Sequence, residues 1–271
     1  MTTRQGFAHP EFLIATEELA RQLDDPDLRV FDCTTHLIPD PKITYQIVPG
    51  RADFEKGHIP GAQFIDLQGD LSEKNHRLRF MLPSGDAFAE AMRRFGVGEG
   101  TRVMLYSTAN PWWATRVWWM LRIFGFDAAA VLDGGWQKWS REGRPVETGP
   151  GKSRPPGNFV VRAQRPLMAG KEEVLRSIGD NAVCTINALS FEQHAGTGGS
   201  TYGRPGHIKA ASIYLRRTCS TRRPTSFGRL TNFASASQRL GRPRKGSSPI
   251  AVAALPRAPM RSRSSCWAIS M

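Results

Sequence analysis

The sequence lacks the patterns that mark several common classes of protein. Its 271 residues include only four cysteines, which lie far apart and form no Cys-x-x-Cys pair. This spacing excludes a zinc knuckle and a disulfide scaffold, and it favours a reducing cytoplasm as the location. No run approaches about 18 uncharged apolar residues, so no membrane-spanning helix is expected. The first ten residues contain no apolar segment, so no secretory signal is expected either.

Acidic side chains are absent from the end of the chain. Residues 210–271 contain eleven Arg and Lys245 but no Asp or Glu, so this tail carries a charge of +12. The remaining residues hold 25 basic and 24 acidic side chains, so the net charge of +13 arises almost entirely in the tail. A basic chain suggests nucleic acid as a partner. The tail has few aromatic residues and no recognised motif. Binding of nucleic acid by this tail would therefore be non-specific and salt-sensitive, and it is the least favoured hypothesis for the function of this chain.

Strand and helix patterns alternate over residues 11–147. Short apolar segments at residues 29–34 and 102–106 predict buried strands. Ser84 suits the N-cap of a helix, and Pro111 suits the first position of another. This alternation predicts an α/β fold with a mainly parallel sheet.

The pattern then starts again in the second half of the chain. Residues 148–169 are rich in Gly and Pro and are predicted to be a linker. Residues 170–209 contain a helical segment, a strand and a Gly-rich loop. The Gly-His-Ile tripeptide at His58 recurs at His207, and each copy follows a helix, a strand and an irregular loop. This internal repeat predicts two copies of one domain.

Four segments carry a resemblance to a known family. They are RADFEKGHIPGA (51–62), WWATRVWWML (112–121), VLDGGWQKWSREGRP (131–145) and YGRPGHI (202–208). These segments resemble the tandem-domain rhodaneses, which are thiosulfate and 3-mercaptopyruvate sulfurtransferases. The resemblance implies two rhodanese-like domains with mainly parallel sheets. It also implies that a Cys of the second domain takes sulfur from a small-molecule donor, becomes a persulfide and passes the sulfur to a thiol or cyanide. No cofactor, metal or membrane partner is expected.

The Cys-containing loop that this chemistry needs is missing. In such a loop, backbone N–H groups and a helix N-terminus favour the thiolate and bind the anionic donor. The corresponding residues 106–111 of the first domain contain no Cys, in agreement with the non-catalytic first domain of the family. Cys219 and Cys266 are not followed by a Gly-rich turn and an apolar helix. Cys33 and Cys184 lie on apolar strands and are predicted to be inert buried thiols.

A shifted reading frame explains the missing loop. In the shifted frame, each new codon consists of the last base of one present codon and the first two bases of the next. Read in this way, the codons from Pro249 to Ala268 permit the sequence Tyr-Cys-Gly-Gly-Gly-Ile-Ala-Ala-Ser, followed by an apolar segment. The same shift from Lys209 permits Gly-Ser-Val-Asn-Leu-Pro-Ala, and both strings suit a second rhodanese domain. The hypothesis therefore places the loss of one base, or the gain of two, near codon 209 and the expected catalytic Cys near Ile250. It predicts that no catalytic residue is intact, that tail 210–271 is aberrant and disordered, and that the chain as written is inactive.

Three further residues are candidates for a role in the site. Arg204 precedes the second Gly-His-Ile and is the candidate for binding an anionic donor, with an ordinary surface Arg as the alternative. His58 and His207 are predicted to stabilise a turn by a hydrogen bond, because no second ligand keeps zinc spacing with either. Thiosulfate and 3-mercaptopyruvate both stay open as donors. A non-catalytic rhodanese-like interaction module is the alternative function.

Overall fold

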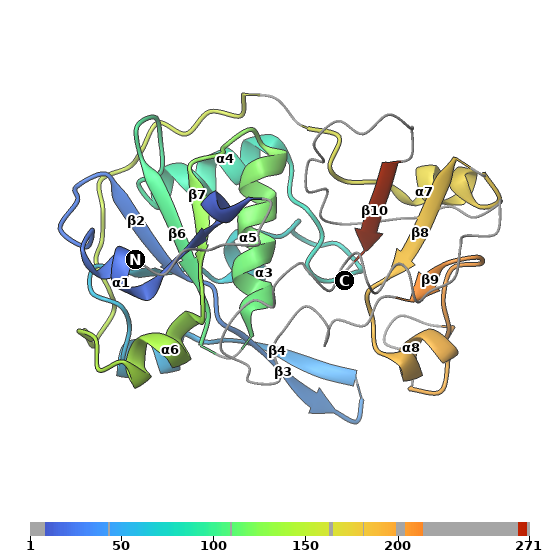
Figure 1. Cartoon of the computed structure of the whole chain (residues 1–271), viewed down its shortest axis with the longest axis horizontal. Helices are drawn as coiled ribbons and strands as arrows, with labels where there is room; N and C mark the ends of the chain where they lie inside the picture. The colour runs from blue at the N-terminus through green and yellow to red at the C-terminus, as the bar shows by residue number, and fades with distance from the viewer. Residues whose placement is uncertain are drawn as a thin grey trace. The chain divides into compact units, whose positions relative to one another are not determined.

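The structure is a computed structural model that falls into two compact units (Figure 1). The first unit is Glu11–Arg165, and the second combines Met1–Pro10 with Pro166–Met271. The structure describes residues 9–42, 44–108, 110–162, 165–180, 182–198, 204–213 and 265–269.

The first unit is built on a five-stranded sheet with the order β1-β7-β6-β2-β5, and every pairing in it is parallel. The strands are β1 (Leu13–Ile14), β2 (Leu28–Asp32), β5 (Gln63–Phe64), β6 (Arg102–Tyr106) and β7 (Ala129–Leu132). Almost every residue of β2, β6 and β7 is buried, as expected for a parallel sheet that is covered on both faces. The predicted α/β class with a mainly parallel sheet is confirmed.

Helices connect these strands and cover the sheet. They are η1 (Pro10–Phe12), α1 (Thr16–Ala20), α2 (Arg51–Lys56), α3 (Leu67–Asp70), α4 (Gly85–Arg94), α5 (Pro111–Ile123) and α6 (Gly135–Arg141). The Ser84 hydroxyl accepts a hydrogen bond from Ala87 N at 3.2 Å, which confirms the predicted N-cap of α4. Pro111 occupies the first turn of α5, also as predicted. No helix within the described ranges is long and apolar enough to cross a membrane.

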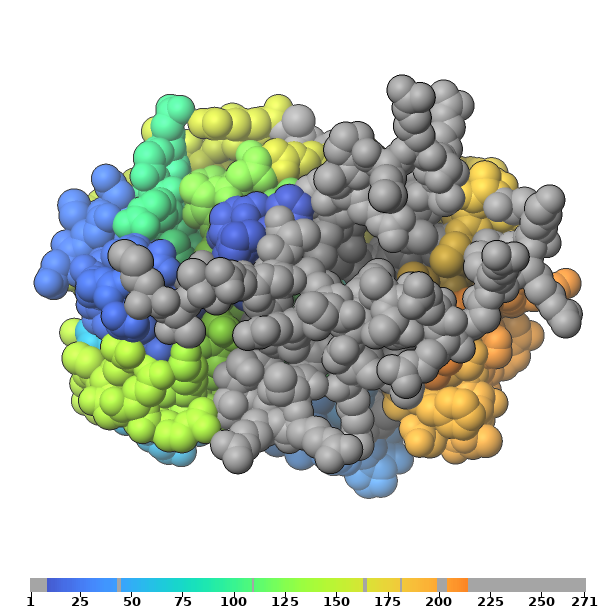
Figure 2. Space-filling view, viewed as in Figure 1, coloured from blue at the N-terminus to red at the C-terminus, as the bar shows by residue number. Residues whose placement is uncertain are grey.

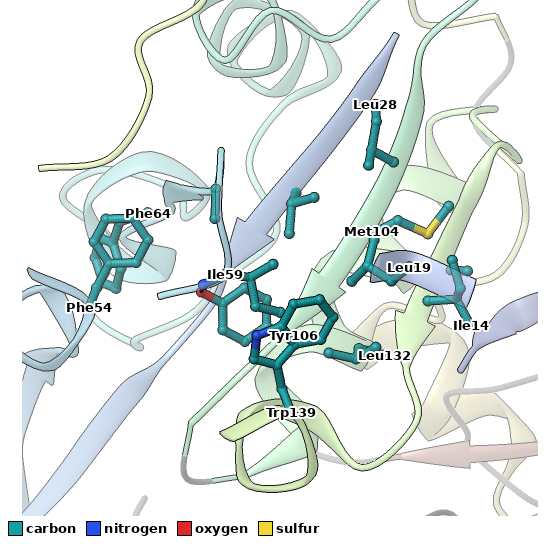
Figure 3. Close-up of a cluster of buried hydrophobic side chains, with 13 residues drawn as sticks. Ile14, Leu19, Leu28, Phe54, Ile59, Phe64, Met104, Tyr106, Leu132 and Trp139 are labelled. Atoms are coloured by element: carbon teal, nitrogen blue, oxygen red, sulfur yellow. Dashed lines mark hydrogen bonds between the residues drawn. The ribbon is translucent and has the colours of Figure 1, made fainter. Parts of the chain in front are cut away.

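Alternate strand residues of the first unit form one apolar cluster (Figure 3). Because every second side chain of a strand points to the same face, these residues share one side of the sheet. They are Leu28 and Val30 of β2, Met104 and Tyr106 of β6, and Ala130 and Leu132 of β7. Leu19 of α1 and Trp139 of α6 close the cluster, and both are fully buried. Burial of each large apolar side chain contributes about 1.5–3 kcal/mol.

The predicted linker covers residues 148–169, but residues 148–162 pack along the first unit. Gly149 N donates a hydrogen bond to Glu55 O at 2.8 Å. Phe159 is 2% exposed, and its ring lies edge-on to the Phe88 ring with the centroids 5.7 Å apart. The first unit therefore extends to the end of this segment, because Phe159 supplies a core side chain that the Gly- and Pro-rich composition conceals.

An antiparallel hairpin forms a separate two-stranded sheet in the first unit, where no element was predicted. It consists of β3 (Thr35–Asp40) and β4 (Thr44–Pro49). Leu37 and Ile38 are 41% and 48% exposed, so no alternation of buried and polar residues marks the strands. Part of the hairpin is visible at the surface in Figure 2.

The second unit contains a three-stranded parallel sheet with the order β10-β8-β9. Its elements are α7 (Lys171–Ser177), β8 (Val183–Asn187), α8 (Phe191–Ala195), β9 (Ser212–Ile213) and β10 (Ser265–Ile269). Strands β9 and β10 belong to the predicted tail 210–271, and the rest of that tail lies outside the described residues.

The described part of the second unit has no apolar core. Thr185 is its one fully buried residue among those described, whereas every fully buried apolar side chain that the structure describes lies between Ile14 and Phe159. Leu175 of α7 and Phe191 of α8 are 55% and 59% exposed. These elements therefore gain little from hydrophobic burial.

The second sheet repeats the strand register of the first. The last residue of β2 in the first unit, and of β8 in the second, pairs with the last residue of both neighbouring strands. These residues are Asp32, Phe64 and Tyr106 in the first unit, and Asn187, Ile213 and Ile269 in the second. Strand β8 thus takes the position of β2, whereas its neighbours β9 and β10 both lie in the predicted tail 210–271.

Candidate active site

The carboxyl ends of β2 and β6 meet at one edge of the first sheet, where α/β proteins bind their ligands. Strand β2 ends at Asp32, β6 ends at Tyr106, and a short loop leads from β6 into α5. The Asn110 side chain accepts a hydrogen bond from Trp112 N at 2.9 Å and caps α5. The loop therefore runs into a helix N-terminus, whose free N–H groups favour negative charge.

Thr34 joins the two strand ends through hydrogen bonds. Thr34 N donates to Asp32 Oδ1 at 2.8 Å, and the Thr34 hydroxyl donates to the same oxygen. Thr108 N donates to Thr34 Oγ1 at 2.9 Å, so Asp32 positions Thr34 and Thr34 positions the loop. The Ser107 hydroxyl lies 3.4 Å from the Thr34 hydroxyl, which is no general base, so this contact does not activate Ser107 as a nucleophile.

Asp32 is a buried carboxyl group with an unusual pKa. Burial raises the pKa of Asp32 to about 6, although the hydrogen bonds from Thr34 and the nearby Tyr106 hydroxyl lower it. Its second oxygen, Oδ2, is buried and has no hydrogen-bond partner among the described residues. An ionised carboxyl group in such a site loses hydration that the protein does not replace.

We expect Asp32→Asn to stabilise the first unit at neutral pH. The Asn side chain keeps an acceptor oxygen for Thr34 and removes the buried charge. The pKa of Asp32 in the folded protein lies above the ordinary value of 3.8. Protonated Asp32 therefore makes its full contribution to the free energy of unfolding below about pH 4, and this contribution is lost as the pH rises through about 6. The free energy of unfolding should therefore increase by about 2 kcal/mol at pH 7.5, and this difference should shrink toward zero near pH 4.

Urea melts followed by tryptophan fluorescence would measure this effect, because six of the seven Trp lie in the first unit. Asp24→Asn is the matched control, since Asp24 is exposed. Its effect should be small and independent of pH. A less stable Asp32→Asn protein at pH 7.5 would show that the Asp32 charge stabilises the fold.

Two cysteines lie within the described strands with different exposure. Cys33 is fully buried, and burial raises the pKa of its thiol well above the usual value, with a further contribution from the Asp32 charge. A thiol held in this form is a poor nucleophile, which confirms the prediction for Cys33. Cys184 was also predicted to be buried, but it is partly exposed, because the described residues around β8 form no apolar core.

The remaining candidate positions do not assemble a site. Cys219 and Ile250, where the catalytic Cys is expected, lie outside the described residues, and Cys266 falls within β10. Arg204 is exposed and forms no ion pair with any residue that the structure describes. Among the described residues, the structure brings Arg204 to no candidate nucleophile.

The two Gly-His-Ile turns share one arrangement. His58 Nδ1 lies 2.9 Å from Phe54 O, and the His58 ring stacks on the Phe54 ring with the centroids 3.9 Å apart. His207 Nδ1 lies 2.7 Å from His194 O, and these two rings stack at 3.7 Å. Burial and the adjacent His207 lower the pKa of His194. The predicted turn-stabilising hydrogen bond is confirmed for both His58 and His207, while the stacking partners were not predicted.

The end of β8 repeats the turn at the end of β2. Leu189 N donates to Asn187 Oδ1 at 2.9 Å, as Thr34 N donates to Asp32 Oδ1 at 2.8 Å. Asn187 is neutral, and Leu189 has no hydroxyl group with which to hold a neighbouring loop. The two units therefore share backbone geometry at this edge but not the polar network.

The parallel α/β sheet, with a loop that enters a helix at its carboxyl edge, agrees with the class of proteins that have a rhodanese fold. Residues 15–142 match the family model of the rhodanese-like domain. The "Sulfur carrier protein TtuD" of Thermus thermophilus is 34% identical over 214 residues, which are 77% of this chain and 69% of that protein. The 3-mercaptopyruvate sulfurtransferase of Escherichia coli is 31% identical over 214 residues, with 74% and 69% covered.

A solved structure extends this similarity. The crystal structure of SseA from Escherichia coli, a 3-mercaptopyruvate sulfurtransferase, aligns with a TM-score of 0.69 and 28% identity. The alignment covers 86% of this chain and 84% of that one. The chain belongs to the rhodanese family, and sulfurtransferases are among its relatives.

Proposed function

We propose that this chain is a two-domain sulfurtransferase that has lost its catalytic loop. The intact enzyme transfers sulfane sulfur from 3-mercaptopyruvate or thiosulfate to a thiol or cyanide in the cytoplasm. With thiosulfate, a Cys thiolate attacks the outer sulfur, the S–S bond of the donor breaks, and sulfite leaves with the electron pair. Cyanide then takes the outer sulfur of the persulfide as thiocyanate and releases the thiolate.

Two repeated local arrangements that lie before residue 210 carry the two-domain part of the proposal. Leu189 N donates to Asn187 Oδ1 as Thr34 N donates to Asp32 Oδ1, so the turns after β8 and β2 match. The rings stacked at His58 and at His207 match as well. Local similarity of this kind at two places along the chain supports duplication of one domain.

Two observations support the loss of the catalytic loop. The described second unit has no apolar core, although the first unit has a complete one. The TtuD alignment covers 77% of this chain, so part of the chain lies outside it. Both observations agree with a chain that follows its family over most of its length and departs from it in one part.

The chain as written is therefore expected to show no sulfurtransferase turnover. Purified protein would be assayed with thiosulfate and cyanide for thiocyanate, and with 3-mercaptopyruvate and a thiol for pyruvate. The rates should equal the uncatalysed rates and should not change in Cys33→Ser, because burial keeps Cys33 protonated. The Escherichia coli relative serves as the positive control. Turnover that disappears in Cys219→Ser or Cys266→Ser would place the nucleophile in the present tail.

A further inference from the structure

A hollow in the first unit lies apart from the loop discussed above and has no role in the proposed function. Its volume is about 390 Å³, and the residues that line it are Gln46 and Ile47 of the hairpin, Gln68 of α3 and Arg79. The hollow therefore lies between the hairpin on one side and α3 with its following loop on the other. Its lining combines a positive charge, two amides and one apolar side chain.

Arg79 brings an uncompensated positive charge to this hollow. Its guanidinium donates to Tyr45 O at 2.9 Å and lies over the Tyr45 ring, 5.6 Å from the centroid. No carboxylate in the described part of the chain lies within ion-pair distance of Arg79, whereas the similarly half-buried Arg102 pairs with Asp25 at 2.6 Å. Only one of the five N–H groups of the Arg79 guanidinium donates to the Tyr45 carbonyl, so the others can bind an anion bidentately.

Gln68 adds a neutral donor at the same hollow. Its carbonyl oxygen accepts a hydrogen bond from Phe80 N at 2.9 Å, which leaves its NH₂ group as the donor end. The amide nitrogen of Gln46, in contrast, already donates a hydrogen bond to Asp40 Oδ2 at 2.7 Å. The donors for an anion are therefore Arg79 and Gln68.

The backbone next to Arg79 is held in a strained conformation. Phe80 has φ +58°, in the left-handed region that non-glycine residues rarely adopt. Its N–H is bonded to Gln68, and its carbonyl accepts a hydrogen bond from Arg116. The surrounding structure thus maintains a turn that sets Arg79 beside Gln68. Strain of this kind is typical of ligand sites.

We propose that this hollow binds a small anion whose charge lies on a carboxylate or a sulfur oxyanion group. The Arg79 guanidinium and the Gln68 amide donate to the anionic oxygens, and Ile47 contacts the apolar body of an organic ligand. The site lies wholly in the first unit, so it does not depend on the sulfurtransferase activity of the intact enzyme.

Calorimetric titration of the full chain with pyruvate and, separately, with thiosulfate tests the site. At least one probe should bind saturably with a Kd on the order of 1 mM. Arg79→Gln should weaken this binding about tenfold or more, the value of a charge-assisted hydrogen bond. Gln68→Glu keeps an acceptor for Phe80 N but places a negative charge in the site, so it should weaken binding at least as much.

Arg77→Gln is the matched control, because Arg77 is exposed and lies two residues away in the same loop. It should change the Kd by less than about twofold, the expectation for a screened surface charge. Unchanged thermal melting of each variant separates lost binding from lost folding. Binding of pyruvate alone assigns the site to organic carboxylates, and binding of thiosulfate alone assigns it to sulfur oxyanions. Absence of saturable binding by both, or equal weakening by Arg77→Gln and Arg79→Gln, overturns the proposal.

Discussion

A gene with one base inserted near codon 209 is expected to produce a chain that forms a persulfide and turns over a sulfur donor. The corrected frame permits Tyr-Cys-Gly-Gly-Gly-Ile-Ala-Ala-Ser, which places a new Cys close to the position of Ile250. Strand β6 of the first unit shows the geometry that this segment should adopt, with a strand end, a short loop and then a helix. Backbone N–H groups in such a loop stabilise the thiolate and attract the anionic donor.

Mass spectrometry would detect one added sulfur atom on the new Cys after incubation with donor, and cyanide should remove it. Replacing that Cys by Ser should lower turnover at least about a thousandfold, since the covalent step has no other nucleophile. Cys33→Ser in the corrected chain is the matched control and should retain activity, because the Cys33 thiol is buried and protonated. The corrected chain should also be less basic than the present one, because Asp and Glu codons return.

One outcome would replace the enzymatic proposal by the alternative function. If the corrected chain unfolds cooperatively but its new Cys takes sulfur from neither donor, the rhodanese-like domains act as a non-catalytic interaction module. The complete first unit, whose loop after Tyr106 contains no Cys, is compatible with that role.

Amide hydrogens of β6 are expected to exchange with solvent more slowly than those of β8 by about a thousandfold or more. Strand β6 lies between β7 and β2 in the buried sheet, so its amides exchange only when the first unit unfolds. Strand β8 also has two neighbours, but almost none of the described residues around it is buried. Its opening therefore costs little free energy.

Hydrogen exchange followed by mass spectrometry would compare peptides that cover residues 102–106 and 183–187. The frame-corrected chain is the matched control, because a completed second domain should protect β8 as strongly as β2. Equally slow exchange of β6 and β8 in the present chain would contradict the absence of a core in the second unit.

Short-range signals in the sequence determined much of what the structure contains. The cap at Ser84, Pro111 in the first turn of α5 and the hydrogen bond of His58 depend on residues within a few positions of one another. The alternation of apolar strands and amphipathic helices likewise predicted the parallel α/β class. Local geometry follows from local chemistry, so one sequence suffices for features of this kind.

Tertiary structure decided the features that depend on distant segments meeting. The raised pKa of Asp32 arises because β2 is enclosed by strands and helices from other parts of the chain, and no neighbour in sequence indicates that enclosure. Phe159 belongs to the core only because its segment runs back to Phe88. The common register of β2 and β8 also appeared only when the strands were paired. The burial of a side chain and the pairing of a strand depend on contacts with segments from all parts of the chain. A pattern of neighbouring residues in the sequence contains no information on those distant contacts.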